Sequence, residues 1–529
     1  MTKNMLRIKL FHLYLSNAHK PMPPEKIKKP RPLRSKAQNE TAKIFSDAQK
    51  KKSRPSRTPL SGPVKLFLLY LIITADILLH FMFFPHPVFR RFDLRTIPFK
   101  NNDLVKKIAN SFSNLNKTRE SRKKGKKYTM TPVTRRLPAP LQEKILSFRQ
   151  YDDDTSALKY DKTSYKHLEF FFNKLLNSIL DENYPRIPIN FFGDSLIAGD
   201  VVPKYIRKNF FSDFGDGGAG FMCVNKPDRG YGNILFRLRS SGWQKKSYAD
   251  YRLDDNYLGI NGFAFTGGAH ATAQFIPYWE SRVHNAKIYY LARPAAGTFN
   301  VVWNNITNTI SAQSNETASA FFTISNALPQ GRLELSVLSG NVTLYGAELY
   351  NHSGITFNVF PFLGAEINKL NRIEETTFMQ QVSETQADFI SLMFWGTTST
   401  YSVLRTNYSD DWQQVCRKLK QALPGAAVVI AGPMGIPRMR GGEYQVKPVI
   451  RHIIHAQRTA AEENGFLFLD LFELTGGEAA LSEWYNRENR LVAPDMIHFA
   501  QRGAEKISTA YYRLLMSCFR KFLEEKNYL

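Results

Sequence analysis

Cysteine is scarce in this sequence. Its 529 residues include only Cys223, Cys416 and Cys518, and an odd number this small does not form a disulfide framework. No group of cysteines and histidines has the spacing of a zinc site. No zinc-finger, RNA-binding or helix-turn-helix pattern is present either. The sequence therefore predicts a protein with no metal or other cofactor and with no nucleic-acid partner.

Acidic residues are scarce in the first 150 residues, and this shortage accounts for the net charge of +26. Residues 1–150 carry 34 Lys and Arg against 8 Asp and Glu, whereas residues 151–529 carry 38 of each kind. We expect residues 1–63 to be a basic, disordered cytoplasmic arm and residues 86–140 to be a basic, flexible spacer. The spacer is interpreted as a solvated tether, and the alternative is attraction to an anionic wall polymer or lipid surface.

One long apolar run, Leu66–Phe84, lies between the two basic segments. Its 19 residues suit one bilayer crossing and no small-residue cleavage site follows, so residues 64–85 are predicted to be an uncleaved transmembrane anchor. A buried core helix is the alternative, and Asp76 makes membrane insertion costly unless it finds a partner. Both flanks carry the same net charge, so charge does not indicate the orientation of the span.

Strands and helices alternate from about residue 141 onward. Five short apolar runs are typical of buried parallel strands; they are Ile187–Phe192, Ile355–Phe362, Phe389–Trp395, Ala427–Ala431 and Phe466–Phe472. Helical patterns precede the first run and occur again at about 365–385, 408–422, 445–464 and 500–518. This alternation predicts an α/β fold with a parallel sheet and helices on both faces.

Residues 222–352 interrupt the alternation. They contain no convincing helix but several alternating or aromatic segments, which Gly-, Asn- and Ser-rich turns separate. The sequence therefore predicts an all-β unit inserted into an α/β domain, which is tolerated when the insertion leaves and re-enters at loops.

Gly193-Asp194-Ser195 follows the first predicted strand and precedes a helix-like segment. A serine at such a turn presents its hydroxyl at the carboxyl end of the sheet, and nearby backbone N–H groups can face a developing oxyanion. The alternative is an ordinary turn in which Asp194 and Ser195 bond only the local backbone.

A candidate base lies at the other end of the α/β part. In Asp495-Met496-Ile497-His498, an aspartate three residues before a histidine can accept the imidazole Nδ1–H, which leaves Nε2 free to take a serine proton. Alone, His498 is more typical of a surface or capping residue. Together with Ser195, at strand ends of one parallel sheet, it indicates a catalytic triad.

This combination resembles the SGNH hydrolases, the GDSL-type esterases, and within them is similar to the periplasmic peptidoglycan O-acetylesterases. Further stretches support the resemblance; they are Phe214–Phe221, Gly346–Leu349, Val359–Ala365, and Gly476–Glu478 through Trp484 to His498. The resemblance implies an SGNH hydrolase domain in two parts, 141–221 and 353–529. It also implies that the inserted unit, 222–352, is a β-sandwich like a carbohydrate-binding module.

By position, the resemblance makes Ser195 the nucleophile, His498 the general base and then acid, and Asp495 the orienting carboxylate. The oxyanion donors would be the backbone N–H groups of Ser195 and Gly364. The family's third donor is an asparagine side chain, and Thr398 stands at that position here. Losing one oxyanion donor costs roughly 10²–10³ in rate, so Thr398 is the main departure from the family pattern.

The function that follows is a membrane-anchored serine esterase that removes O-acetyl groups from a cell-wall glycan of the peptidoglycan type. The implied location is the bacterial inner membrane, with a single span and the catalytic domain in the periplasm. Two alternatives stay open: a polysaccharide O-acyltransferase that uses the same triad, and a non-catalytic glycan-binding or scaffold protein with a degenerate oxyanion hole.

Overall fold

The computed structural model describes residues 136–148, 154–227, 231, 233, 235–250, 255–278, 282–395, 407–486, 488–489 and 491–529. All of them belong to the compact unit Thr129–Leu529. The predicted arm, the predicted anchor, most of the predicted spacer, and Thr398 lie outside the described residues. No helix within the described ranges has the length and apolarity that a bilayer crossing requires.

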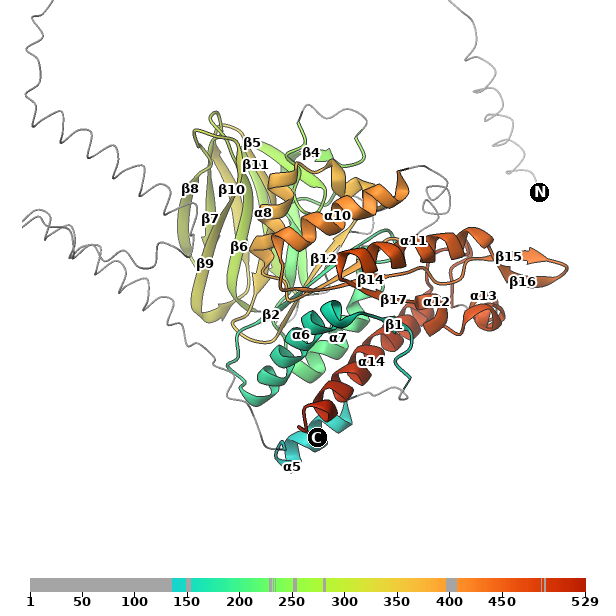
Figure 1. Ribbon diagram of the computed structural model, residues 1–529. Helices are drawn as coiled ribbons and strands as arrows, with labels where there is room; N and C mark the ends of the chain where they lie inside the picture. Colours follow the sequence, from blue (N-terminus) through green and yellow to red (C-terminus); the bar gives the residue numbers. More distant parts are fainter. Residues whose placement is uncertain are drawn as a thin grey trace, which may run out of the picture. The chain divides into compact units, whose positions relative to one another are not determined.

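A six-stranded sheet forms the centre of the α/β part (Figure 1). Its order is β1-β17-β14-β13-β2-β12, and all neighbours are parallel except β1 and β17. The strands are β1 (Leu158–Lys159), β2 (Ile187–Gly193), β12 (Ile355–Pro361), β13 (Phe389–Met393), β14 (Ala427–Ala431) and β17 (Leu467–Leu469). The five predicted strands are thus confirmed, whereas the two-residue antiparallel edge strand β1 is too short to leave a pattern.

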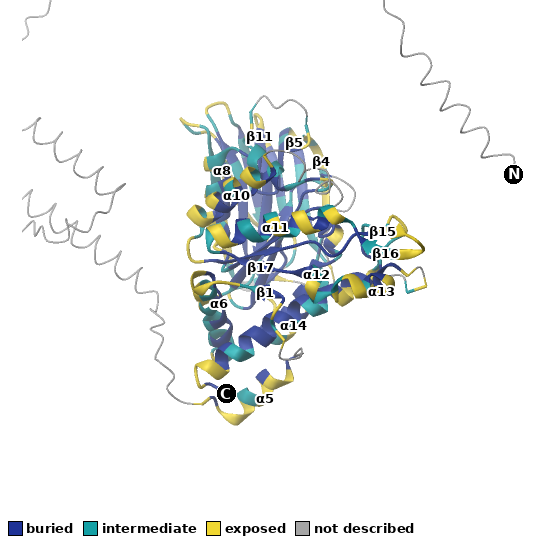
Figure 2. Cartoon of the chain, turned by 45° about the vertical axis from the view of Figure 1, so that its right-hand side comes forward, coloured by how far each residue is buried: buried dark blue, intermediate teal, exposed yellow. Residues whose placement is uncertain are grey.

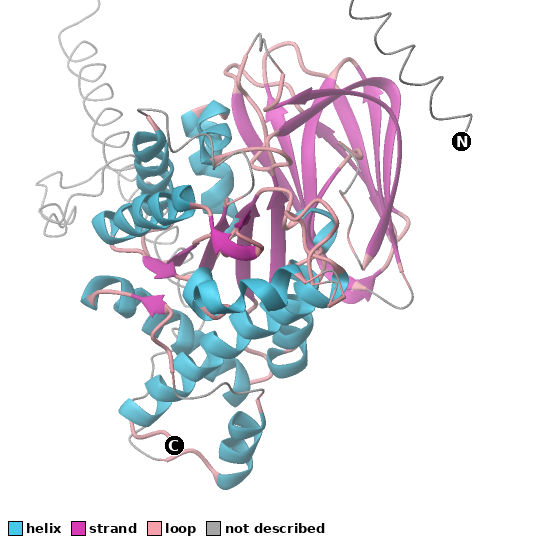
Figure 3. Ribbon diagram, turned by 90° about the vertical axis from the view of Figure 1, so that its right-hand side faces the viewer, coloured by secondary structure: helices cyan, strands magenta, loops and turns pink. Residues whose placement is uncertain are grey.

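Helices cover both faces of this sheet, as the alternation predicted (Figures 1 and 3). One face carries α6 (Lys162–Leu180), α7 (Pro203–Phe214) and α14 (Gln501–Glu525); the other carries α8 (Glu375–Thr385), α10 (Tyr408–Ala422) and α11 (Pro448–Asn464). Successive residues of β2 face opposite sides, so Phe191 packs in one core and Phe192 in the other. Apolar strands buried on both faces need this double cover.

Some boundaries differ from the sequence prediction: β13 ends at Met393 and α14 continues to Glu525. Three other differences have local reasons. The segment predicted as one helix at 365–385 is a 3₁₀-helix, η4, followed by α8. The helix predicted from 445 begins at Pro448, because residues 443–446 pair in a hairpin. Strand β17 ends early because the Asp470 side chain accepts the Glu473 N–H and starts a short helix. The remaining elements are α5 (Ala139–Ser147), η3 (Ala198–Asp200), η4 (Ile367–Arg372), β15 (Pro437–Arg440), β16 (Glu443–Val446), α12 (Leu471–Leu474), η5 (Gly477–Ala480) and α13 (Leu481–Tyr485).

The inserted unit is built from nine strands that hydrogen-bond in one sheet (Figure 3). They are β3 (Gly220–Cys223), β4 (Phe236–Ser247), β5 (Phe263–Pro277), β6 (Val283–Ala292), β7 (Thr298–Trp303), β8 (Ile306–Ser311), β9 (Ala318–Gln330), β10 (Leu333–Ser339) and β11 (Val342–Tyr350). The main path is β8-β7-β10-β5-β11-β6-β9, with β3 paired to β11 and β4 to β5. After β11 the chain returns to the parallel sheet through β12.

The inserted β-unit is joined to the parallel sheet by a common apolar core and by a buried polar network. One buried cluster contains both Phe360 of β12 and Phe221 of β3, whose rings lie 5.2 Å apart. In Figure 2, β11 of the inserted β-unit and β17 of the parallel sheet are both coloured largely as buried. Beside this cluster, fully buried Glu348 of β11 accepts hydrogen bonds from Arg186 at 2.7 Å, Tyr289 at 3.2 Å and Asn358 at 3.3 Å. These contacts fix the inserted β-unit on the sheet that carries Ser195.

Candidate active site

Ser195 lies in a tight turn at the carboxyl end of β2. The turn lies close to β13, since a Cβ added to Gly193 would approach the Met393 carbonyl oxygen to 2.6 Å. Asp194 is 1 % exposed, and its carboxylate accepts the Leu196 N–H at 2.9 Å and the Trp395 N–H at 2.9 Å. Asp194 therefore attaches the turn to the end of the neighbouring strand, which holds Ser195 at the edge of the sheet.

The chain does not pass directly from Ser195 into a helix. Gly199 and Asp200 both have left-handed φ values, +61° and +63°, in the 3₁₀ turn η3, and α7 begins only at Pro203. The predicted strand-to-helix turn is therefore longer than expected. Asp200 forms an ion pair with Arg207 of α7, and both residues are buried, at 4 % and 1 % exposure. This pair connects the segment after Ser195 to the helix.

The three residues predicted as a triad lie together in hydrogen-bonding order. Ser195 Oγ is 2.7 Å from His498 Nε2, and His498 Nδ1 is 2.7 Å from Asp495 Oδ2. With Asp495 accepting the Nδ1–H, the Nε2 atom is the acceptor for the Ser195 hydroxyl proton. This is the geometry in which an imidazole removes a proton from a serine nucleophile.

The loop that carries the base is a compact turn ahead of α14. Residue Val492 bridges to Phe499, the Ala493 N–H donates to the His498 carbonyl at 2.7 Å, and Met496 adopts a left-handed φ of +59°. Asp495 Oδ1 accepts the backbone N–H groups of Ile497 at 3.0 Å and His498 at 3.1 Å. One carboxylate therefore shapes the loop and orients the imidazole.

The environment of Asp495 keeps its carboxylate charged. Burial acts to raise its pKa, but the hydrogen bonds from the His498 ring and from the Ile497 and His498 N–H groups outweigh burial, and the pKa is lowered. A carboxylate that stays ionised stabilises the imidazolium that forms when His498 takes the serine proton.

Gly364 lies at the same edge of the sheet as Ser195. Strand β12 pairs with β2 up to Pro361 and Gly193, and the Phe362 N–H donates to the Gly193 carbonyl at 2.7 Å. Among the residues that the structure describes, neither the Ser195 nor the Gly364 backbone N–H donates to a protein acceptor. Both are therefore available to an oxyanion, whereas Thr398, the third predicted donor, lies outside the described ranges.

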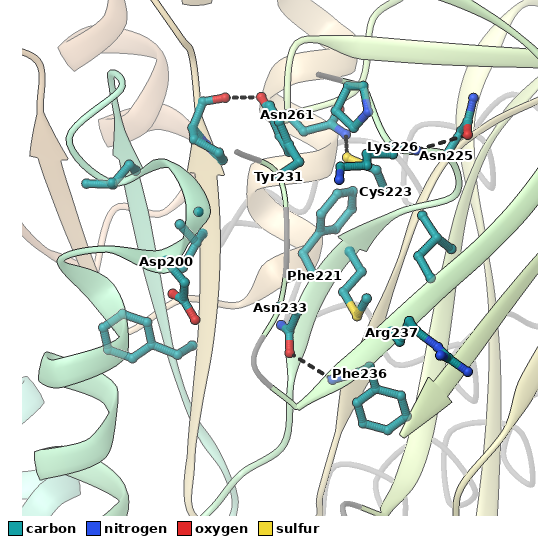
Figure 4. A pocket seen from close by; sticks show the side chains of 18 of the residues that line it. Asp200, Phe221, Cys223, Asn225, Lys226, Tyr231, Asn233, Phe236, Arg237 and Asn261 are labelled. Carbon is teal, nitrogen blue, oxygen red and sulfur yellow. Dashed lines mark hydrogen bonds between the residues drawn. The ribbon is translucent and has the colours of Figure 1, made fainter. Parts of the chain in front are cut away.

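A cavity of about 210 Å³ lies between the segment after Ser195 and the inserted β-unit (Figure 4). Its walls combine aromatic rings with carboxylate, amide and cationic side chains; they include Asp200, Phe221, Asn225, Lys226, Asn233, Phe236 and Arg237. Cys223 also lines it, and burial raises the pKa of this thiol to about 12. No sequence pattern indicates this cavity, because its two walls come from segments that meet only in the folded chain.

No family model matches this chain, and no curated protein matches it. Among solved structures, it is similar to a peptidoglycan O-acetylesterase at 19 % identity, with a TM-score of 0.58 over 69 % of this chain and 99 % of that one. A GDSL-like lipase from Parabacteroides merdae matches at 15 % identity and a TM-score of 0.23, over 33 % of this chain and 74 % of that one. A carbohydrate-binding module of family 29 matches at 13 % identity and a TM-score of 0.18, over 26 % of this chain and 94 % of that one. The first likeness alone is close enough to define a fold, and it shows that this chain shares the fold of that peptidoglycan O-acetylesterase.

Proposed function

We propose that this protein is a serine esterase in which Ser195, His498 and Asp495 are the catalytic triad. The main support for this proposal is a pair of contacts: Ser195 Oγ lies 2.7 Å from His498 Nε2, and His498 Nδ1 lies 2.7 Å from Asp495 Oδ2. A degenerate, merely structural site would not require the imidazole to lie between a serine hydroxyl and a carboxylate in this order.

The residues support a two-step acyl transfer. His498 Nε2 takes the Ser195 proton as Oγ attacks the ester carbonyl, and the Ser195 and Gly364 N–H groups face the resulting oxyanion. The C–O bond to the alcohol then breaks, the alcohol oxygen takes the proton from His498, and an acyl-enzyme remains. Water that His498 deprotonates attacks this ester and releases the acid, which restores the Ser195 hydroxyl.

The proposed substrate is an O-acetylated cell-wall glycan of the peptidoglycan type, from which acetate is released. Two observations support this choice. The chain shares its fold with a peptidoglycan O-acetylesterase along 99 % of that protein. The cavity between the segment after Ser195 and the inserted β-unit also offers aromatic rings and amides, which are the groups that bind sugar rings and hydroxyls.

We also propose that residues 64–85 anchor the chain in the bacterial inner membrane and that the esterase acts in the periplasm. What supports this is the length of the apolar run in the sequence together with the location of a wall polymer outside the cytoplasm. A reporter fused after residue 150 tests the topology, and a cytoplasmic reporter signal would contradict it.

The test of the function is acetate release from O-acetylated peptidoglycan by the purified full-length chain. The wild type should release acetate, and Ser195→Ala should release none above the rate without protein. Transfer of the acetyl group to a glycan hydroxyl, with no free acetate, would identify an acyltransferase instead. Binding of the polymer with equal, negligible turnover by both proteins would identify a non-catalytic glycan-binding protein.

A further inference from the structure

Tyr248 connects the inserted β-unit to the proposed active site. It follows β4 directly and is 3 % exposed, so it has the environment of an ordinary core tyrosine. Its hydroxyl, however, donates across the junction to the Leu363 carbonyl oxygen at 2.9 Å. Leu363 belongs to the loop that follows β12 in the parallel sheet.

The Leu363 carbonyl and the Gly364 N–H are the two ends of one peptide unit. The atoms of a peptide unit lie in one plane, and in the trans form its C=O and N–H point in opposite directions. A hydrogen bond that holds the Leu363 oxygen therefore fixes the direction of the Gly364 N–H. That N–H is the oxyanion donor proposed above.

The peptide lies at the centre of a four-residue turn, and such turns have two common forms, type I and type II. The Ala365 N–H donates to the Phe362 carbonyl at 3.2 Å, and Gly364, at the third position of the turn, has φ of +63°. Leu363 is not among the residues with positive φ, so the turn is of type II. Type I differs from type II mainly by a flip of the central peptide, which would point the Gly364 N–H the opposite way.

Tyr248 is itself held firmly. Arg372 of η4 donates to the Tyr248 carbonyl and, at 2.7 Å, to the Asp250 carbonyl. The Tyr248 ring lies 5.0 Å from the Phe362 ring, and a Cβ added to Gly262 would approach both rings, to 2.6 Å and 2.5 Å. A second tyrosine of the inserted β-unit, Tyr231, donates to the carbonyl of Pro361, the last residue of β12 (Figure 4).

We infer that Tyr248 is a positioning residue for the oxyanion hole: its hydroxyl holds the Leu363–Gly364 peptide in the orientation that presents the Gly364 N–H to the substrate. The inserted β-unit is therefore part of the catalytic apparatus and not only a separate binding module. This inference rests on the proposed esterase function.

The experiment compares Tyr248→Phe with Tyr345→Phe in the full-length chain. Tyr345 is a matched control, because it too is a buried tyrosine of the inserted β-unit whose hydroxyl donates to a backbone carbonyl, that of Tyr257 at 3.2 Å. The measurements are kcat and KM for p-nitrophenyl acetate and the inhibition constant of methylboronic acid, which forms a tetrahedral adduct with a nucleophilic serine.

Tyr248→Phe should lower kcat about tenfold with little change in KM. This is the effect expected when one neutral hydrogen bond is lost and its loss destabilises the transition state but not the bound substrate. Binding of the boronic acid by Tyr248→Phe should weaken by a similar factor. Tyr345→Phe should stay within about twofold of the wild type in all three quantities. Arg372→Gln releases the Tyr248 backbone but keeps the Tyr248 hydroxyl, and it should also lower kcat. This variant replaces Tyr248→Phe in the test if Tyr248→Phe does not fold.

Equal kcat values for the wild type and a folded Tyr248→Phe, or equal losses in the two tyrosine variants, would overturn this inference while leaving the esterase function intact. If Tyr248→Phe does not fold, a wild-type kcat in Arg372→Gln would overturn it. A wild type without Ser195-dependent turnover would overturn the proposed function, and this inference with it.

Discussion

Ser195 Oγ and His498 Nε2 lie 2.7 Å apart although 303 positions separate the two residues. The docking of α14 explains how this distance is maintained. Ser508 of α14 donates to the Val202 carbonyl at 2.9 Å, just beyond the Ser195 turn, and Tyr511 donates to Ser391 of β13 at 3.2 Å. The helix that follows the His498 loop is thus bonded both to the segment that follows Ser195 and to the neighbouring strand.

Asp495→Asn should lower kcat for ester hydrolysis by roughly 10³–10⁴-fold without unfolding the protein. The amide oxygen still accepts a backbone N–H and keeps the loop, but the amide N–H₂ faces Nδ1 and favours the tautomer with the proton on Nε2. That tautomer does not accept the Ser195 proton.

The control for this variant is Asp181→Asn, because Asp181 accepts the Asn183 N–H at 2.9 Å in a similar local turn ahead of β2, whereas Ser195 follows the other end of that strand. It should retain the wild-type kcat. Comparable activity of Asp495→Asn and Asp181→Asn would contradict the role assigned to Asp495.

Gly364→Ala should lower both activity and stability. An added Cβ meets no atom within 4 Å, so the effect comes from the left-handed φ alone, which costs an alanine about 1–2 kcal/mol. The alanine favours the type I turn, and the Gly364 N–H then turns away from the oxyanion. Steady-state kinetics and urea denaturation measure the two effects.

Gly441→Ala is the control that separates the loss of activity from the loss of stability in Gly364→Ala. Gly441 has φ of +61° and equally open surroundings, but it lies at the tip of the β15–β16 hairpin. Gly441→Ala should show a similar loss of stability and no loss of kcat. A Gly364→Ala enzyme with wild-type kcat would show that this peptide does not serve the oxyanion.

Arg207→Met should destabilise the protein by about 3–5 kcal/mol, because it leaves the Asp200 carboxylate buried without its cation. The double variant Asp200→Asn with Arg207→Met removes both charges, and asparagine tolerates the left-handed φ at position 200. Urea denaturation should show that the double variant is more stable than Arg207→Met. If Arg207→Met were the more stable of the two variants, an unpaired buried charge on Asp200 would not explain the loss of stability.

Asp161→Ala should destabilise α6 by about 1 kcal/mol near neutral pH, since Asp161 accepts the Ser164 N–H at 2.7 Å in a capping box. Hydrogen bonds from the Ser164 backbone and side chain lower the pKa of Asp161 below its ordinary value. The ionised cap therefore contributes stability above the unfolded pKa, and the contribution is lost as the pH falls through the folded pKa. Denaturation curves of both proteins should differ at about pH 7 and converge as the pH falls through the lowered pKa of Asp161; a difference that persists unchanged in acid would contradict this account.

Local patterns were sufficient to predict the sheet and the Asp495–His498 pair. Each parallel strand is an apolar run buried on both faces, and the Asp495–His498 spacing is set by one short loop, so both are visible without knowledge of tertiary contacts. The order of Ser195 early and His498 late, with an all-β insertion between, then made the family resemblance specific.

Other features depend on contacts between distant segments and could not be predicted. Nothing near Tyr248 in the sequence indicates that its hydroxyl reaches Leu363, which lies 115 positions away. The link between Asp194 and the Trp395 N–H spans 201 positions. Helix α7 starts late because Gly199 and Asp200 have left-handed φ values. The spacing of apolar residues in the sequence does not indicate these φ values.

The most direct test of the account is a peptide map of the full-length chain after rapid mixing with p-nitrophenyl acetate and an acid quench. The account predicts an acetyl group on the peptide that contains Ser195 in the wild type, together with a burst of nitrophenol, and neither in His498→Ala. An acetyl group on another residue, or turnover without acetylation of Ser195 and without a burst, would contradict a covalent mechanism at Ser195.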